Sequence, residues 1–281
     1  MARSYLFIPG NEPRMLQNAE IFEADAIILD LEDAINVDEK DEARTLVRLF
    51  LREHPREGTP FYVRINSEKD LMRRDLEALK GLDFEGIVLP KVSMRMLALF
   101  ENEASEVKID PDILALIETP EAFSDLHHMA QYDKVIGYIL GAVDLTRALG
   151  ATRTVEGDEI AYARGMLKMW AAANNLEAID TPWASLDETS LAKDTHKARI
   201  MGFDGKCAIH PNQIPRINEA FAPSNEAIKE AKRIVKKHKE TNSMRFALDG
   251  HMVDKPVVEA AKATLEKALR YGIEEGDDDS L

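Results

Sequence analysis

Short apolar runs alternate with longer helical segments along most of the chain, and this alternation constrains the fold more than any other feature. The runs are rich in β-branched and aliphatic residues and are bounded by turn residues or charges, as strands are. Eight of them occur, at residues 5–8, 26–29, 61–65, 86–89, 113–117, 135–140, 178–179 and 205–209. Helical spacing or helix-start signals lie between them, for example at residues 39–53, 70–80, 120–131, 159–174 and 186–201. Since parallel strands need a crossover helix, eight such units predict an α/β fold, a closed (β/α)8 TIM barrel.

The chain of 281 residues is longer than eight strand–helix units require. The signals after residue 209 are, in order, a helix at 212–220, a second helix from Ser224 to about 239, a turn-rich stretch at 248–256, a helix to about 271 and an acidic tail at 274–280 that should fray. We therefore expect a TIM-barrel catalytic domain over residues 1–222. A C-terminal helical extension that carries a lid segment should occupy residues 223–281.

Composition and charge exclude several classes of protein. The chain is 45% hydrophobic and 31% charged, which is typical of a globular protein. It has 36 Lys and Arg against 51 Asp and Glu, a net charge of −15 that disfavours nucleic acid and anionic membranes as partners. The single cysteine, Cys207, excludes an intramolecular disulfide and fits a reducing compartment. No apolar stretch approaches the ~20 residues of a membrane span, so we expect a cytoplasmic protein.

The ends of the apolar runs are rich in polar side chains. The carboxyl ends of barrel strands form the face on which active sites are built, so groups that follow different strands converge there. The residues at or just after the runs include Asp30, Glu32, Asp33, Arg64, Asn66, Lys91, Glu118, Asp144, Asp180 and His210. One such residue is weak evidence, because acids also cap helices, but the convergence of so many predicts a polar cavity at this face.

Two of these acids follow neighbouring strands and point to a metal site. The carboxylates of Glu118 and Asp144 are expected close enough to share one ion. Two carboxylates, with positions left open for water or substrate, are what Mg2+ favours. The alternative is structural: Asp144 caps a helix at 145–149, and Glu118 only precedes the Thr119 cap of another helix. Spacing alone leaves both interpretations open.

Arg64 ends the third strand and is the candidate anchor for an anionic substrate. Its planar guanidinium can grip a carboxylate at two points, although an internal ion pair with Asp30, Glu32 or Asp33 is the alternative. Glu32 and Asp33 are expected to support this arginine, or water on the metal, from behind.

Three further residues carry side chains that could take part in chemistry, and each has an expected role. Asp254 lies beyond the barrel, where an acid on a flexible flap can be delivered to a closed site; the alternative is a helix cap before Lys255 and a first-turn proline. His210 is expected to line the substrate pocket. Cys207 lies within the last apolar run, where burial makes a thiol inert, so a role as nucleophile is not expected.

Nine short motifs occur in an order and spacing that resemble a known family over nearly the full length of the chain. They are RSYLFIPG at 3–10, LDLEDA at 29–34, VRIN at 63–66, VLPK at 88–91, IETP at 117–120, GAVDL at 141–145, GFDGK at 202–206, IHP at 209–211 and MVD at 252–254. Each is short, but together they resemble the citrate lyase β-subunit-like family of the HpcH/HpaI aldolase superfamily, which also holds malyl-CoA and citramalyl-CoA lyases.

The resemblance implies roles for particular residues. Mg2+ would be held by Glu118 and Asp144, and Arg64 would bind the 2-oxo acid part of the substrate. Asp254 would act as acid/base in the site of a neighbouring subunit, within a homotrimer or hexamer. The remaining positions that match substrate-binding residues of the family are Phe7, Arg14, Ala142, Val143, Ile209 and His210.

These implications predict a Mg2+-dependent carbon–carbon lyase. It would cleave a 3-hydroxyacyl-CoA thioester of the malyl, citramalyl or citryl type to a 2-oxo acid and an acyl-CoA such as acetyl-CoA. Citrate lyase chains often have asparagine where this chain has His210, which favours a coenzyme A thioester over an acyl-carrier thioester. The alternatives are a malyl-thioester thioesterase, a malate-synthase-like condensing enzyme, and a citrate lyase β subunit that acts on an acyl-carrier thioester.

Overall fold

The computed structural model describes residues 2–54, 58–241, 243 and 245–273. It divides into two compact units, Met1–Glu219 and Ala220–Leu281. The acidic tail at 274–280 that the sequence predicts to fray lies outside the described residues.

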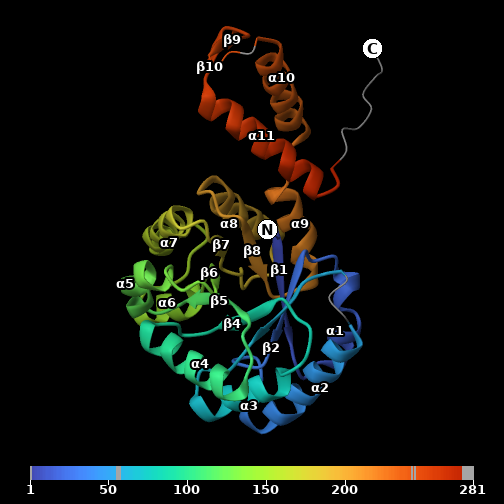
Figure 1. Cartoon of the computed structure of the whole chain (residues 1–281), viewed down its shortest axis with the longest axis vertical. Helices are drawn as coiled ribbons and strands as arrows, with labels where there is room; N and C mark the ends of the chain where they lie inside the picture. The colour runs from blue at the N-terminus through green and yellow to red at the C-terminus, as the bar shows by residue number, and fades with distance from the viewer. Residues whose placement is uncertain (1, 55–57, 242, 244, 274–281) are drawn as a thin grey trace. The chain divides into compact units, whose positions relative to one another are not determined.

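The first unit is a closed barrel of eight parallel strands, which confirms the predicted fold (Figure 1). The strands pair in chain order, and the last pairs with the first through Ser4 and Lys206. They are β1 (Ser4–Pro9), β2 (Ala26–Asp30), β3 (Phe61–Arg64), β4 (Gly86–Leu89), β5 (Asp112–Ile117), β6 (Val135–Leu140), β7 (Glu177–Asp180) and β8 (Gly205–Ala208). Closure brings the carboxyl ends of all eight strands to one face.

Helices connect the strands, and several begin where the sequence supplies a cap. Ser93, Thr119 and Asp187 each accept a hydrogen bond from a backbone N–H in the first turn of the following helix. The helices of this unit are α1 (Pro13–Gln17), α2 (Lys40–Glu53), α3 (Lys69–Leu79), α4 (Met94–Val107), α5 (Pro120–Met129), α6 (Ala142–Leu149), α7 (Ala161–Ala173), α8 (Glu188–Ile200) and α9 (Ile214–Phe221), which crosses the unit boundary; short 3-10 turns are η1 (Ala19–Phe22), η2 (Val37–Glu39), η3 (Asp158–Ile160) and η4 (Pro211–Gln213).

The barrel core is built from alternate residues of the strands, because successive side chains of a strand point to opposite faces. Ala26 and Ile28 of β2, and Leu114 and Leu116 of β5, belong to one buried cluster. Cys207 joins the same cluster, and burial raises the pKa of its thiol, which agrees with an inert cysteine.

The second unit consists of two helices and a β-hairpin. The helices are α10 (Asn225–Thr241) and α11 (Lys255–Arg270), and the hairpin strands are β9 (Phe246–Leu248) and β10 (His251–Val253). The sequence predicted only a turn-rich stretch here. The hairpin forms because Asp249 and Gly250 both take positive φ, of 51° and 80°, as a tight two-residue turn between antiparallel strands requires.

Candidate active site

A cavity of about 320 Å³ opens at the carboxyl ends of the barrel strands. Four carboxylates and one arginine lie in its wall, so its polar part carries excess negative charge. The rest of the wall is largely apolar, which is typical of small-molecule sites. The lining residues are Phe7, Pro9, Asp30, Asp33, Ala34, Arg64, Leu116, Glu118, Ile139, Leu140, Gly141, Ala142, Val143, Asp144, Thr181, Pro182 and Ile209.

Glu118 is the most perturbed carboxylate in this wall. It follows β5, is 3% exposed, and accepts a hydrogen bond of 2.6 Å at Oε1 from the backbone N–H of Lys91. Burial raises the pKa of Glu118 to about 8, and the negative charges of Glu32 and Asp144 act in the same direction. In the absence of a bound cation, this side chain therefore holds a proton near neutral pH.

Asp144 lies in the first turn of α6, which starts earlier than the sequence indicated. The helix begins at Ala142, and its N-cap is Gly141, so the alternative interpretation of Asp144 as a helix cap is wrong. The side chain forms an ion pair of 2.5 Å with Arg147 at the surface. The predicted pair of carboxylates therefore lines one cavity, with Asp144 close enough to influence the titration of Glu118.

Gly141 allows α6 to start directly against Glu118. A Cβ at this position would lie 2.4 Å from the Cβ of Glu118 and 3.0 Å from its Oε2. Any other residue would push the helix away from the carboxylate. Glycine is thus required by the close approach of the two segments that supply Glu118 and Asp144.

The donor set fits a divalent cation. Carboxylate oxygens are the ligands that Mg2+ prefers, and two of them with an adjoining open cavity leave room for water or substrate oxygens. The raised pKa of Glu118 is consistent with this fit, because a bound cation would offset both the burial and the neighbouring negative charges that favour the protonated form.

Arg64 forms the internal ion pair that the sequence left as an alternative. Its Nε and one terminal nitrogen lie 2.7 and 2.5 Å from the two oxygens of Asp30, and its other terminal nitrogen is 3.3 Å from Glu32. Asp30 thus occupies the Nε edge of the guanidinium, and the predicted grip on a substrate carboxylate stays a prediction. The guanidinium still lines the cavity and lies 4.9 Å from the centre of the Phe7 ring.

Glu32 and Lys91 form a second contact behind the cavity. Lys91 Nζ lies 2.8 Å from Glu32 Oε1, and its backbone takes a positive φ of 49°. That left-handed backbone is uncommon for lysine. Lys91 thus donates hydrogen bonds to two acids, to Glu32 from its ammonium group and to Glu118 from its backbone N–H. Glu32 is buried in this support position, whereas Asp33 is half exposed and lines the cavity.

Four of the remaining predicted residues lie in the cavity wall. Phe7, Ala142, Val143 and Ile209 are among the lining residues. Val143 and Ile209 are 59% and 44% exposed, so they form an apolar rim.

Arg14 and His210 are not among the residues that line this cavity. Arg14 is exposed on α1, and His210 Nδ1 accepts the N–H of Asn212 at 3.1 Å as the cap of η4.

Asp254 lies in the second unit and caps α11. Its Oδ1 accepts the N–H of Val257 at 3.4 Å, and a proline follows in the first turn, as in the alternative that the sequence left open. A cap does not exclude acid/base chemistry, because the second carboxylate oxygen has its own lone pairs.

Several lining residues were not predicted from the sequence as site residues, among them Thr181 and Pro182, and the requirement for Gly141 was not predicted either. Thr181 and Pro182 directly follow Asp180, which the strand-end rule had already singled out. Extending that rule by two residues would have found them. The role of Gly141 depends on the approach of a second segment, for which the sequence holds no signal.

Comparison with known proteins gives a consistent result. A family model described as HpcH/HpaI aldolase/citrate lyase matches residues 3–211, and one described as a C–C bond lyase of the TIM-barrel fold matches residues 170–273. The citrate lyase subunit beta of Leuconostoc mesenteroides subsp. cremoris is 32% identical over 282 residues, covering 95% of this chain and 93% of that protein. The (3S)-malyl-CoA thioesterase of Cereibacter sphaeroides (strain ATCC 17029 / ATH 2.4.9) is 34% identical, covering 95% and 94%.

A similar solved structure is that of the protein CitE from Mycobacterium tuberculosis in complex with magnesium, acetoacetate and coenzyme A. It matches with a TM-score of 0.78 and 30% identity, and covers 95% of this chain and 97% of that one. Within the described ranges of the present chain, no helix is both long and apolar enough to cross a membrane.

Proposed function

The chain belongs to the HpcH/HpaI aldolase/citrate lyase family, and from this premise we propose that it is a Mg2+-dependent carbon–carbon lyase. Its substrate is a 3-hydroxyacyl-CoA thioester of the malyl, citramalyl or citryl type. Its products are a 2-oxo acid and an acyl-CoA such as acetyl-CoA. The magnesium, acetoacetate and coenzyme A bound by the M. tuberculosis relative support the cofactor and the two halves of the substrate.

One observation carries the proposal: Glu118 and Asp144 line the same cavity, and burial, together with the negative charges of Glu32 and Asp144, raises the pKa of Glu118 to about 8. A structural role gives no reason to place two carboxylates there without a cation. A bound Mg2+ would polarise the hydroxyl and carboxylate oxygens of the substrate and lower the pKa of that hydroxyl.

The protein's own groups orient the substrate. The first N–H groups of α6 have no intrahelical partner, and Gly141 supplies no side chain to cap them, so the helix start around Val143 suits an anionic carboxylate. Arg64 adds a positive charge to the same wall, held in place by Asp30. The apolar rim of Val143 and Ile209 suits the less polar thioester portion.

Cleavage transfers the electron pair of the broken carbon–carbon bond to the thioester, which becomes an enolate. The hydroxyl loses one proton and the enolate carbon gains one, so the reaction has no net proton change. We assign both proton transfers to the carboxylate of Asp254, which would accept the hydroxyl proton and return it to the enolate carbon, and which is supplied from the second unit of a neighbouring subunit in a trimer or hexamer. A general acid of this kind contributes about 10²- to 10⁴-fold to a rate.

A thioesterase is the nearest alternative, because a 34% identical relative carries that activity in its name. Condensation in the malate-synthase direction, or action on an acyl-carrier thioester inside a citrate lyase complex, would use the same cavity. These activities differ in their products and partners.

The test is an assay of the purified chain with malyl-, citramalyl- and citryl-CoA. We expect Mg2+-dependent release of a 2-oxo acid with the thioester of the acyl-CoA product intact, and loss of activity in EDTA. Release of free CoA would instead identify a thioesterase. Activity that EDTA does not diminish would refute the role of the metal.

Asp254→Asn tests the acid/base assignment, because asparagine also caps helices and so preserves the start of α11. We expect turnover to fall about 10²- to 10⁴-fold, with Mg2+ affinity unchanged. Steady-state rates and calorimetric titration of Mg2+ measure the two quantities. Full turnover in this variant would exclude Asp254 as the proton donor.

A further inference from the structure

A buried ionic network lies beneath the ends of β7 and β8, and the proposed chemistry does not use it. Arg164 and Lys206 provide two positive charges, and Asp180 and Asp194 provide two negative ones. Arg164 is 1% exposed and the other three are fully buried. The arginine pairs with both acids at 2.8 Å. A network that is satisfied and sealed in this way holds its members in one geometry.

The network extends to the cavity through Lys206. A lysine ammonium has three protons to donate. Two of them meet Asp180 and Asp194 at 2.6 Å, and the third meets the backbone carbonyl of Thr181, also at 2.6 Å. Thr181 follows β7 directly and lines the cavity. The carbonyl of Thr181 is therefore held by a buried side chain whose three donors are all used.

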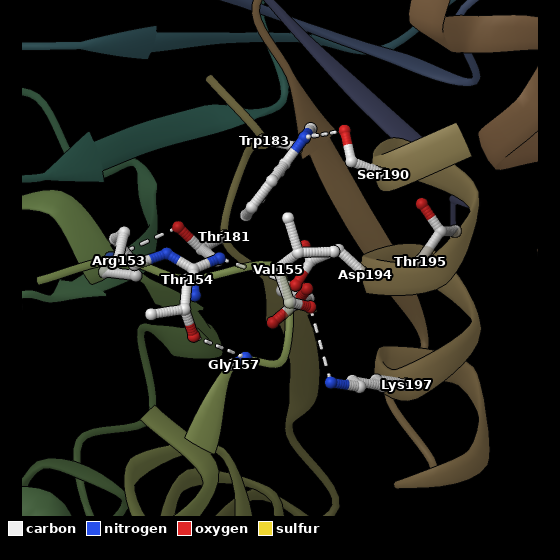
Figure 2. Close-up of polar contacts among 12 residues, drawn as sticks. Arg153, Thr154, Val155, Gly157, Thr181, Trp183, Ser190, Asp194, Thr195 and Lys197 are labelled. Carbon is white, nitrogen blue, oxygen red and sulfur yellow. Dashed lines mark hydrogen bonds and ion pairs between the residues drawn. The ribbon is translucent and has the colours of Figure 1, made fainter. Parts of the chain in front are cut away.

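The loop that follows Thr181 is fastened at further points. Trp183 donates from its indole nitrogen to Ser190 Oγ on α8 at 2.9 Å, as Figure 2 shows. The side chain of Gln213 donates to the carbonyl of Trp183 at 2.9 Å. These contacts hold the loop in place, and the loop in turn fixes the position of the Thr181 side chain.

The hydroxyl of Thr181 reaches the helix that carries Asp144. Its Oγ1 accepts the backbone N–H of Ala142 at 3.2 Å. Ala142 is the first residue of α6, whose N-cap Gly141 provides no side-chain acceptor. Thr181 thus caps, from another strand, a helix that cannot cap itself. Asp144 lies in the same first turn.

We propose that Thr181 is a positioning residue that aligns the first turn of α6, and with it Asp144, for binding a divalent cation together with Glu118. The inference rests on the proposed function, in which these two acids hold Mg2+. The ionic network fixes the backbone of Thr181 through Lys206. The hydroxyl of Thr181 in turn fixes the start of α6 through its hydrogen bond with the N–H of Ala142.

The experiment measures cation binding rather than activity, in the full chain without substrate. Thr181→Val keeps the shape and removes the acceptor, and Thr181→Ser keeps the hydroxyl. Calorimetric titration of the metal-free protein with Mg2+ and Mn2+ gives dissociation constants, and thermal melting without metal monitors the fold. We expect Thr181→Val to weaken binding about tenfold or more, and Thr181→Ser to stay within about twofold of the unmodified chain.

A matched control is Thr195→Val, which also removes a buried threonine hydroxyl. The hydroxyl of Thr195 donates to the carbonyl of Leu191 within α8, so its loss should leave cation affinity unchanged. If Thr181→Val does not fold, Thr181→Ala takes its place.

Unchanged affinity in the variant that lacks the hydroxyl, or equal weakening in Thr181→Ser, would overturn the role of Thr181 alone. Absence of cation binding in the unmodified chain would overturn the metal site itself and this role with it.

Discussion

Two clusters of charge at the mouth of the same barrel differ in their balance. In the cavity wall, Asp30, Asp33, Glu118 and Asp144 face one cation, Arg64. In the network below β7 and β8, the buried Asp180 and Asp194 meet the buried Arg164 and Lys206, and Arg153 approaches Asp194 at 3.4 Å. One cluster is open and carries excess negative charge, and in the other the buried acids are balanced by cations.

The pKa values of one acid from each cluster record this difference. Burial raises the pKa of Glu118 to about 8, because the N–H of Lys91 and the charge of Arg64 compensate only in part for the loss of water and for the neighbouring carboxylates. Burial acts on Asp194 in the same direction, but Lys206 and Arg164 outweigh it and lower its pKa to about 2. Similar burial thus has opposite results. An acid whose charge is left unbalanced in a cavity indicates a ligand, and an acid whose charge is balanced indicates architecture.

Glu118→Gln should produce the largest effect, and it should be on function. The amide keeps the shape but cannot bind a cation as an anion, so we expect Mg2+-dependent turnover to fall about 10²- to 10⁴-fold, the several kcal/mol that a metal ion supplies. Stability without metal should not decrease, because the replaced acid already carries a proton at neutral pH. Rates and thermal melting test both statements.

Glu121→Gln is the control for this variant, since Glu121 is an exposed acid in the first turn of α5. It should change neither quantity. If Glu118→Gln lost as much stability as Asp194→Asn, a variant in the buried network, the two clusters would not differ in the way proposed.

Asp194→Asn should produce the next largest effect, and it should be on stability. Removing one negative charge leaves the buried Arg164 and Lys206 to share the charge of Asp180, which costs about 3–5 kcal/mol of unfolding free energy. Urea unfolding at pH 7 measures this.

The pH dependence of that cost has a definite sign. The pKa of Asp194 is lowered on folding, so its contribution is present above the ordinary value of 3.8 and disappears as pH falls towards about 2. Glu106→Gln, which removes an exposed partner of Arg73, is the control and should change stability by less than about 1 kcal/mol. Equal losses in the two variants would contradict a special role for the buried network.

The smallest effect should be a pH dependence of cation affinity. Below about pH 8, Mg2+ must displace a proton from Glu118, so the affinity for Mg2+ should rise about tenfold for each pH unit and level off above pH 8. In the metal-free protein, the free energy of unfolding should change with pH in the opposite direction. The folded state binds this proton more tightly than the unfolded chain, so stability falls as pH rises from about 5 to 8. Titration of Mg2+ at pH 6, 7, 8 and 9 is the measurement, and a flat profile would remove Glu118 from the ligand set.

The sequence predicted the barrel and the positions of most polar lining residues, because both follow from local rules. Strand period and helix caps are properties of neighbouring residues, and a group that ends a parallel strand must lie at the carboxyl face. Asp30, Glu118 and Asp144 were found in this way. The hairpin at Asp249 and Gly250 was missed, although its turn signal is local too.

The amino-acid sequence by itself thus determined which residues meet at the mouth of the barrel. The tertiary structure decided which contacts these residues make. Arg64 pairs with Asp30 through two nitrogens, and Gly141 lets α6 approach Glu118 closely. Thr181 accepts a hydrogen bond from the N–H of Ala142. The physical reason is that these contacts join segments that meet only when the barrel closes. Contact distances are set to within a few tenths of an ångström, and water is excluded and charges are balanced, only once the barrel has closed. These three factors determine the pKa values and the hydrogen-bond partners.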